Sequence, residues 1–215
     1  MLPVQDVIPS PRTPLVTLTL VAASGALAVY LAGVTPPSRL TFLLRYGLVP
    51  AWATPWSFVT SQVVQPDLVS GFLNLLALWI FGDNVEARLG RVGFVATYVG
   101  GGVLAAVASV AIDPAARLVL PAAAGAAASV MGAYLVLLPR SRVMVLVPVW
   151  KALDLVDVPA VVVILCWLAL HVMRHAGTIA APAPLTGAVI VPLAGLAAGS
   201  IAGRLLGRGT VSRNW

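Results

Sequence analysis

Charged residues are so sparse along this chain that long stretches contain none, and their spacing constrains the fold more than any other feature. Six charge-free intervals stand out, at 13–38, 68–82, 92–112, 118–139, 158–173 and 176–203. A helix rises about 1.5 Å per residue and the apolar part of a bilayer is about 30 Å thick, so about 20 apolar residues span it. Four intervals reach that length. The two short ones, 68–82 and 158–173, need flanking residues or a locally thinned bilayer.

The composition agrees with a chain that faces lipid. Apolar residues make up 60% of the sequence and charged residues only 9%, whereas a soluble domain has roughly a quarter of its residues charged. The net charge is +6, but the sequence has no basic cluster with interleaved aromatic residues, which binding to DNA or RNA requires. The sequence therefore predicts an integral membrane protein with no nucleic-acid partner.

We predict an all-α fold of six transmembrane helices between short terminal segments, 1–13 and 209–215. A seventh charge-free stretch, 46–66, contains prolines and scattered polar side chains, while Trp52 and Trp56 favour the headgroup level. We therefore expect an interfacial loop over 35–65. The predicted helices are at about 14–34, 66–83, 92–112, 119–138, 156–174 and 187–206.

The distribution of basic residues predicts the orientation. Six spans place both termini on one side, and the basic residues expected there are Arg12, Arg88, Arg91, Arg140, Arg142, Lys151, Arg204, Arg208 and Arg213. Those expected on the other side are Arg39, Arg45, Arg117 and Arg174. Because cytoplasmic loops carry the excess of Lys and Arg, both termini are predicted to be cytoplasmic in a multi-pass protein of the cell membrane.

Small residues recur at helical spacing in two of the predicted spans. Gly195, Gly199 and Gly203 are four residues apart and share one helical face, and Gly125 and Gly132 lie in a stripe of alanines and serines at 122–133. Small residues let two helix backbones approach closely within a membrane. We therefore predict close packing between these two helices.

Four segments, taken in order and at their spacing, resemble bacterial rhomboid proteins. They are the amino-terminal stretch 1–14, the segment Gly-Asp-Asn-Val-Glu-Ala-Arg-Leu-Gly at 82–90, the end of the fourth span at 132–143, and Pro-Leu-Ala-Gly-Leu-Ala-Ala-Gly at 192–199. The resemblance implies the six-helix rhomboid fold, in a bacterial inner membrane, with 46–66 in the long first loop of the family. It also implies that Glu86 and Arg88 form a structural turn after the second span.

Three of the four residues that carry rhomboid catalysis are absent from their places, and only Asn74 remains. Rhomboid proteases use a serine in a Gly-x-Ser-Gly motif on the fourth helix and a histidine on the sixth, as nucleophile and general base. A His-x-x-x-Asn pattern on the second helix helps to stabilise the oxyanion. Here the nucleophile position is Ala124 and the base position is Pro192, while the helix-two pattern reads Ser70 to Asn74.

The two histidines of the chain offer a further candidate site. His171 and His175 are four residues apart and lie on one helical face, so both could reach a metal or a metal-bearing cofactor. Two ligands without a nearby carboxylate or thiol make a weak site, and we predict neither a metal nor a cofactor.

Three functional hypotheses remain. In the first, the chain is a proteolytically inactive rhomboid-like protein that binds transmembrane segments or is a structural subunit of a membrane complex. In the second, it is an active intramembrane serine protease with a relocated nucleophile. In the third, it is a cofactor-binding membrane subunit that uses His171 and His175. A transporter or channel has little support, because charged residues lie only at the ends of the predicted spans.

Overall fold

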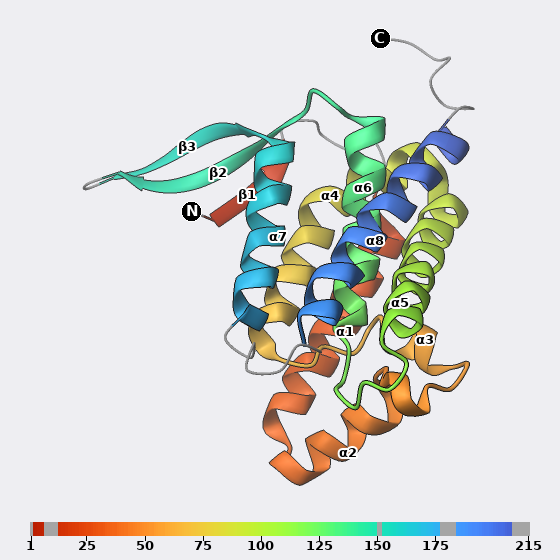
Figure 1. Ribbon diagram of the computed structural model, residues 1–215. Helices are drawn as coiled ribbons and strands as arrows, with labels where there is room; N and C mark the ends of the chain where they lie inside the picture. Colours follow the sequence, from red (N-terminus) through yellow and green to blue (C-terminus); the bar gives the residue numbers. More distant parts are fainter. Residues whose placement is uncertain (1, 7–12, 150–151, 177–183, 208–215) are drawn as a thin grey trace.

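The computed structural model describes residues 2–6, 13–149, 152–176 and 184–207, and it is a bundle of helices with a small sheet at one end (Figure 1). In chain order the elements are β1 (Leu2–Asp6), α1 (Leu15–Gly33), α2 (Pro36–Tyr46), the short 3-10 helix η1 (Pro50–Trp52), α3 (Ser57–Thr60), α4 (Leu68–Val95), the π-helical turn η2 (Ala96–Gly100), α5 (Gly101–Ile112), α6 (Ala122–Leu137), β2 (Arg142–Val149), β3 (Ala152–Pro159), α7 (Ala160–Ala176) and α8 (Pro184–Leu206).

Within the described residues, three helical stretches are long and apolar enough to cross a membrane: Leu15–Gly33, Leu68–Ile112 and Val189–Leu206. The helices Ala122–Leu137 and Ala160–Arg174 are apolar but shorter. Their length does not disqualify them, because a helix that packs mainly against protein need not match the bilayer thickness itself.

Gly90 divides the longest of these stretches, Leu68–Ile112. Its backbone has φ 70° and ψ 170°, a left-handed conformation that glycine adopts without the steric cost that a side chain brings. Its position has nothing within 4 Å of where a Cβ would lie, so conformation rather than space requires the glycine. The chain turns here, and α4 and α5 run on different sides of α6 (Figure 1).

Helix α6 forms the centre of the bundle. Every residue from Ala122 to Tyr134 is buried, and α4, α5 and α8 all contact it. A helix that is apolar all round is one that is enclosed all round, and the small side chains of α6 let three neighbours approach at once.

The contact between α6 and α8 is the closest in the fold, and glycines make it possible. A Cβ on Gly199 would overlap the backbone carbonyl of Ser129, and one on Gly132 would overlap the carbonyl of Leu196. A Cβ on Gly203 would lie 3.0 Å from the Cα of Ala133. The two backbones therefore approach to a separation that only small residues allow.

The segment 35–65 has more structure than the interfacial loop that we expected. It contains α2, η1 and α3, and its last part enters the bundle, where Ser61, Gln62, Val64 and Gln65 are each at most 3% exposed. Hydrogen bonds explain the burial, because Gln62 Nε2 donates to the carbonyls of Phe58 at 2.9 Å and Val99 at 3.1 Å. Gln62, one of the polar side chains on which we based the interfacial loop, instead satisfies two backbone carbonyls.

The all-α prediction also misses a three-stranded antiparallel sheet of order β1-β2-β3. Residues 156–159, which we assigned to the start of the fifth helix, end strand β3, and α7 begins only at Ala160. The physical reason is local. β-branched valines alternate along both strands, which favours a pleated surface, and a proline at 159 disfavours helix in the residue before it.

Candidate functional site

The two positions at which the resemblance places a nucleophile and a base lie at the contact between α6 and α8. Ala124 is 0% exposed and Pro192 is buried. A Cβ on Gly125 would lie 2.9 Å from Val191 Cγ1, so the first turns of α6 meet α8 at the level of Pro192. A methyl group and a pyrrolidine ring have no proton to exchange, so these two side chains cannot act as nucleophile and general base.

Pro192 lies inside α8 rather than in its first turn, which begins at Pro184. A proline in a helix interior donates no backbone hydrogen bond and crowds the preceding turn. The residue thus replaces an ionisable side chain with a group that weakens its own helix. Close packing of α8 on α6 compensates for that local cost.

Ser70 and Asn74 lie one turn apart on α4, and each is 1% exposed. Asn74 Nδ2 donates a hydrogen bond to Gln65 Oε1 at 3.0 Å. The side chain of Gln65 also lies against Gly71, where a Cβ would be 3.1 Å from Gln65 Cβ. A buried polar contact therefore joins α4 to the end of the first loop. The sequence analysis did not identify the role of Gln65, whose only signal was a glutamine beside a proline in a stretch with scattered polar side chains.

Two other buried or half-buried serines could be considered as relocated nucleophiles, and both donate to backbone carbonyls. Ser129 Oγ lies 2.8 Å from the carbonyl oxygens of Thr97 and Ala126. Ser200 Oγ donates to the carbonyl of Leu196 at 2.8 Å. A serine becomes a nucleophile when an adjacent base takes its proton, and carbonyl oxygens do not serve as such a base.

Glu86 caps the amino-terminal end of α1. The backbone N–H groups of Val16 and Thr17 donate to its carboxylate at 3.1 and 2.8 Å, and the Thr17 hydroxyl donates to it at 2.8 Å. Helix α1 starts after Pro14 and has no side-chain cap of its own. The free N–H groups of a helix start need acceptors, and a carboxylate also interacts favourably with the helix dipole. Glu86, 5% exposed, supplies both functions from α4.

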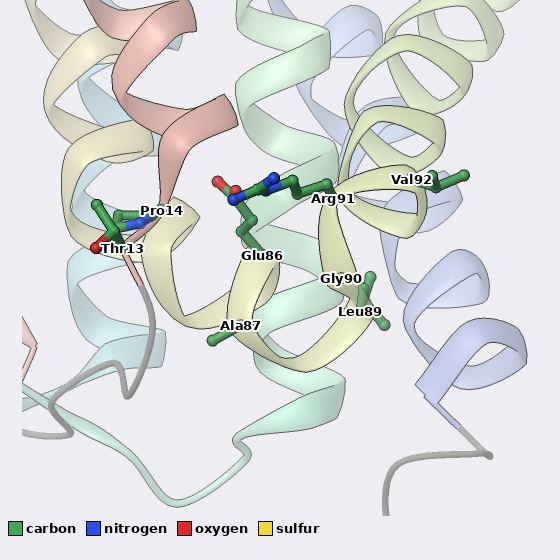
Figure 2. A pocket seen from close by; sticks show the side chains of 8 residues that line it. All are labelled: Thr13, Pro14, Glu86, Ala87, Leu89, Gly90, Arg91 and Val92. Carbon is green, nitrogen blue, oxygen red and sulfur yellow. The ribbon is translucent and has the colours of Figure 1, made fainter.

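Arg88 reaches from the same turn to the far end of α6, where its Nη1 lies 3.4 Å from the carbonyl of Leu137. A cation at the carboxyl-terminal end of a helix interacts favourably with the dipole. A cavity of about 380 Å³ adjoins this turn, and Figure 2 shows Arg91 extending across it toward Glu86. The cavity is lined by Thr13, Pro14, Glu86, Ala87, Leu89, Gly90, Arg91 and Val92.

An apolar groove of about 180 Å³ lies between α4 and α7, and the start of the hairpin β2–β3 closes one end of it. Its walls are Phe72, Leu73, Leu76, Ala77, Ile80 and Phe81 of α4, Val145 and Val158 of the sheet, and Val162, Val163, Cys166, Trp167 and Leu170 of α7. Sequence analysis did not find this groove, because its two helices are separated in the chain by α5, α6 and the hairpin, and only the tertiary fold brings them together.

Two polar contacts join the walls of the groove. Trp167 Nε1 donates to the carbonyl of Leu73 at 3.1 Å. Beyond the groove, Arg174 Nη2 lies 2.7 Å from Asp67 Oδ1, which also accepts hydrogen bonds at the amino-terminal end of α4. Partial burial of the Asp67 carboxyl opposes its ionisation, but hydrogen bonds from Ser70 and the charge of Arg174 outweigh burial, so the pKa of Asp67 lies below its ordinary value.

His171 is buried in α7, only 1% exposed, and its ring stacks on Trp167 with centroids 4.2 Å apart. His175 belongs to the same helix, but its side chain lies outside the described residues. The structure thus places His171 in the packing beside the groove. It gives no geometry for a shared ligand of the two histidines.

The comparisons with known proteins bear on the part of the chain from α3 onward. The Rhomboid domain family matches residues 53–208, which is more than half of the 215 residues of the chain. No curated protein and no solved structure matches significantly. The match covers α4 to α8, including the groove and the positions of Ser70, Asn74, Ala124 and Pro192. It confirms the resemblance inferred from the sequence: the chain is a membrane protein that belongs to the rhomboid family.

Proposed function

We propose that this rhomboid-family protein is proteolytically inactive and binds a transmembrane segment of a client protein in the groove between α4 and α7. The observation that carries the proposal is an apolar groove combined with a site in which Ala124 and Pro192 stand at the positions of nucleophile and base. The groove can receive side chains of a helix that packs over it, and the residues beyond it cannot cleave that helix by the chemistry of the family.

The proposal includes a membrane arrangement. The start of α1, the end of α4 and the end of α6 lie together, because Glu86 and Arg88 of α4 reach the other two. With Gly90 as a turn, this geometry supports six crossings. The excess of arginine at this end supports cytoplasmic termini, in a bacterial inner membrane.

Binding would depend on packing. Lipid is as apolar as a client helix, so association in a membrane is driven by close contact and hydrogen bonds rather than by hydrophobic exclusion. Leu170 lines the groove and is 46% exposed, and it offers such a contact surface. A stable complex with one client would make the protein a structural subunit, and brief binding would make it an escort.

Site-specific photo-crosslinking in the native membrane tests this proposal. A photoreactive amino acid at Leu170 is expected to give adducts that map to a transmembrane segment of another protein. The matched control is Leu104 on α5, a leucine that is 60% exposed and outside the groove. Equal adducts at both positions would refute a groove-specific client.

A second measurement separates the proposal from the protease alternative. The purified protein is incubated in detergent or vesicles with a fluorophosphonate, which labels activated serines. We expect no labelling, because neither Ser129 nor Ser200 contacts a base. Stoichiometric labelling that maps to one serine would establish a relocated nucleophile and overturn the claim of inactivity.

A further inference from the structure

The cavity beside the turn at Gly90 has both an acidic and a basic side chain in its wall. Glu86 and Arg91 both line this space of about 380 Å³, and their charged groups point toward one another (Figure 2). Among the described residues, no ion pair within 4.0 Å includes either of the two side chains. The carboxylate and the guanidinium therefore face the same cavity without neutralising each other directly.

The carboxylate of Glu86 has room for one more hydrogen-bond donor. Its Oε2 accepts two hydrogen bonds, from the Thr17 N–H and the Thr17 hydroxyl, both at 2.8 Å. Its Oε1 accepts one, from the Val16 N–H at 3.1 Å. A carboxylate offers about four lone-pair sites, so Oε1 keeps one of them. Because Glu86 lines the cavity, a donor bound there can meet this oxygen.

Arg91 supplies the opposite charge. Its side chain is exposed, and a guanidinium group presents paired N–H donors that match the oxygens of a phosphate. An anion alone would be attracted by Arg91 but repelled by Glu86, and a cation alone would meet the reverse situation. The cavity is therefore complementary to a ligand that carries both charges, with its anion at Arg91 and its cation at Glu86.

The cavity lies where a lipid-facing surface ends. Thr13 and Pro14 line it and directly precede Leu15–Gly33, which is long and apolar enough to cross a membrane. Val92, which also lines the cavity, is 84% exposed, and Leu15 at the start of α1 is 47% exposed. Aliphatic side chains exposed at the end of a membrane span face acyl chains. A lipid can therefore place its headgroup in the cavity and its chains along these side chains.

We propose that the cavity binds the headgroup of a phospholipid that has both a phosphate and a primary ammonium, as in phosphatidylethanolamine. The phosphate accepts hydrogen bonds from Arg91, and the ammonium donates one to Glu86. This headgroup has about eight non-hydrogen atoms, which at about 30 Å³ each need about 240 Å³, and the cavity of about 380 Å³ holds it. Phosphatidylcholine has no N–H to donate, and phosphatidylglycerol has no cation to meet the carboxylate. The inference does not depend on client binding between α4 and α7.

Native mass spectrometry with defined lipids tests this assignment. The delipidated protein in detergent is titrated separately with dioleoyl phosphatidylethanolamine, phosphatidylcholine and phosphatidylglycerol, and the bound fraction gives an apparent Kd for each lipid. Arg91→Gln removes the cation of the cavity. Arg204→Gln is the matched control, because Arg204 is also exposed but does not line the cavity. Unfolding followed by tryptophan fluorescence shows whether each variant is folded.

We expect phosphatidylethanolamine to bind several-fold more tightly than either other lipid. Arg91→Gln should weaken its binding by about tenfold, because a charge-assisted contact is lost, and Arg204→Gln should leave the Kd unchanged. If Arg91→Gln does not fold, the comparison of the three lipids on the unmodified protein remains decisive.

Three results would overturn the proposal. Phosphatidylcholine or phosphatidylglycerol that binds as tightly as phosphatidylethanolamine would show that the ammonium is not recognised. An equal effect of the two arginine substitutions, including no effect, would place the lipid outside the cavity. Glycerophosphoethanolamine has the headgroup without acyl chains, and it should not displace the lipid at equal concentration. Displacement would assign the cavity to a soluble ligand instead.

Discussion

The cap that Glu86 provides for α1 should contribute a measurable part of the unfolding free energy of the bundle, and Glu86→Ala tests this contribution. The substitution removes three hydrogen bonds, from Val16 N–H, Thr17 N–H and the Thr17 hydroxyl. Hydrogen bonds to charged groups contribute about 1.5–3 kcal/mol each, and a lost helix cap costs about 1 kcal/mol. One carboxylate serves all three bonds and loses hydration on burial, so the contributions do not add. We expect unfolding to become easier by about 2–4 kcal/mol.

The assay is reversible unfolding in mixed micelles of dodecyl maltoside and sodium dodecyl sulfate, followed by tryptophan fluorescence. Thr17→Val is the matched control, because it removes only the hydroxyl bond and should cost about 1 kcal/mol. Glu86→Gln retains one acceptor oxygen, so its loss of unfolding free energy should fall between those of Thr17→Val and Glu86→Ala. In the double variant, Thr17→Val should cost little beyond Glu86→Ala, because its partner is already absent. A loss below about 0.5 kcal/mol for Glu86→Ala would refute the capping argument.

Four further outcomes follow from the packing and the charges. Gly199→Ala places a Cβ against the Ser129 carbonyl and should destabilise the fold by about 1–3 kcal/mol in the same assay. Gly100→Ala has open space around it and should be neutral or stabilise by up to about 1 kcal/mol. Ser129→Ala removes one buried hydroxyl that binds two carbonyls and should cost about 1 kcal/mol, with no change in fluorophosphonate labelling. The lowered pKa of Asp67 means that its carboxylate stabilises the fold above the unfolded-chain value of 3.8 and loses this effect as the pH falls below it. Asp67→Asn should therefore flatten the dependence of the unfolding free energy between about pH 5 and pH 3.

Helices were the part of this fold that the sequence could reveal, because charge-free length is a direct requirement of the bilayer. Helix α1 covers Leu15–Gly33 where 14–34 was expected, and α6 covers Ala122–Leu137 where 119–138 was expected. The sequence analysis did not predict the hairpin, because Lys151, Asp154 and Asp157 were interpreted as the boundary between two spans. Only the pairing of residues in the sheet shows that Asp154 and Asp157 lie within a strand.

The candidate site also has a part that the sequence could predict and a part that it could not. The prediction that the nucleophile and the base are absent rests on the identity of two residues, Ala124 and Pro192, and on the resemblance to the family. The cap by Glu86 and the contact of Gln65 with Asn74 join segments far apart in the chain. The groove between α4 and α7 likewise arises from tertiary placement. No local pattern specifies which distant backbone group a buried side chain will meet.

The enclosure of α6 has a consequence for the order in which the protein is made. When a ribosome has synthesised α6, it has not yet made α8, so the surface around Gly132 and Ser129 enters the bilayer without its partner. Helix α6 has 16 residues and is rich in alanine and glycine, so it has few large apolar side chains to anchor it in the bilayer before α8 is made. The centre of the bundle can therefore pack only after the last helix is made. A chain truncated before Gly195 would lose the packing of its core and not only a peripheral helix.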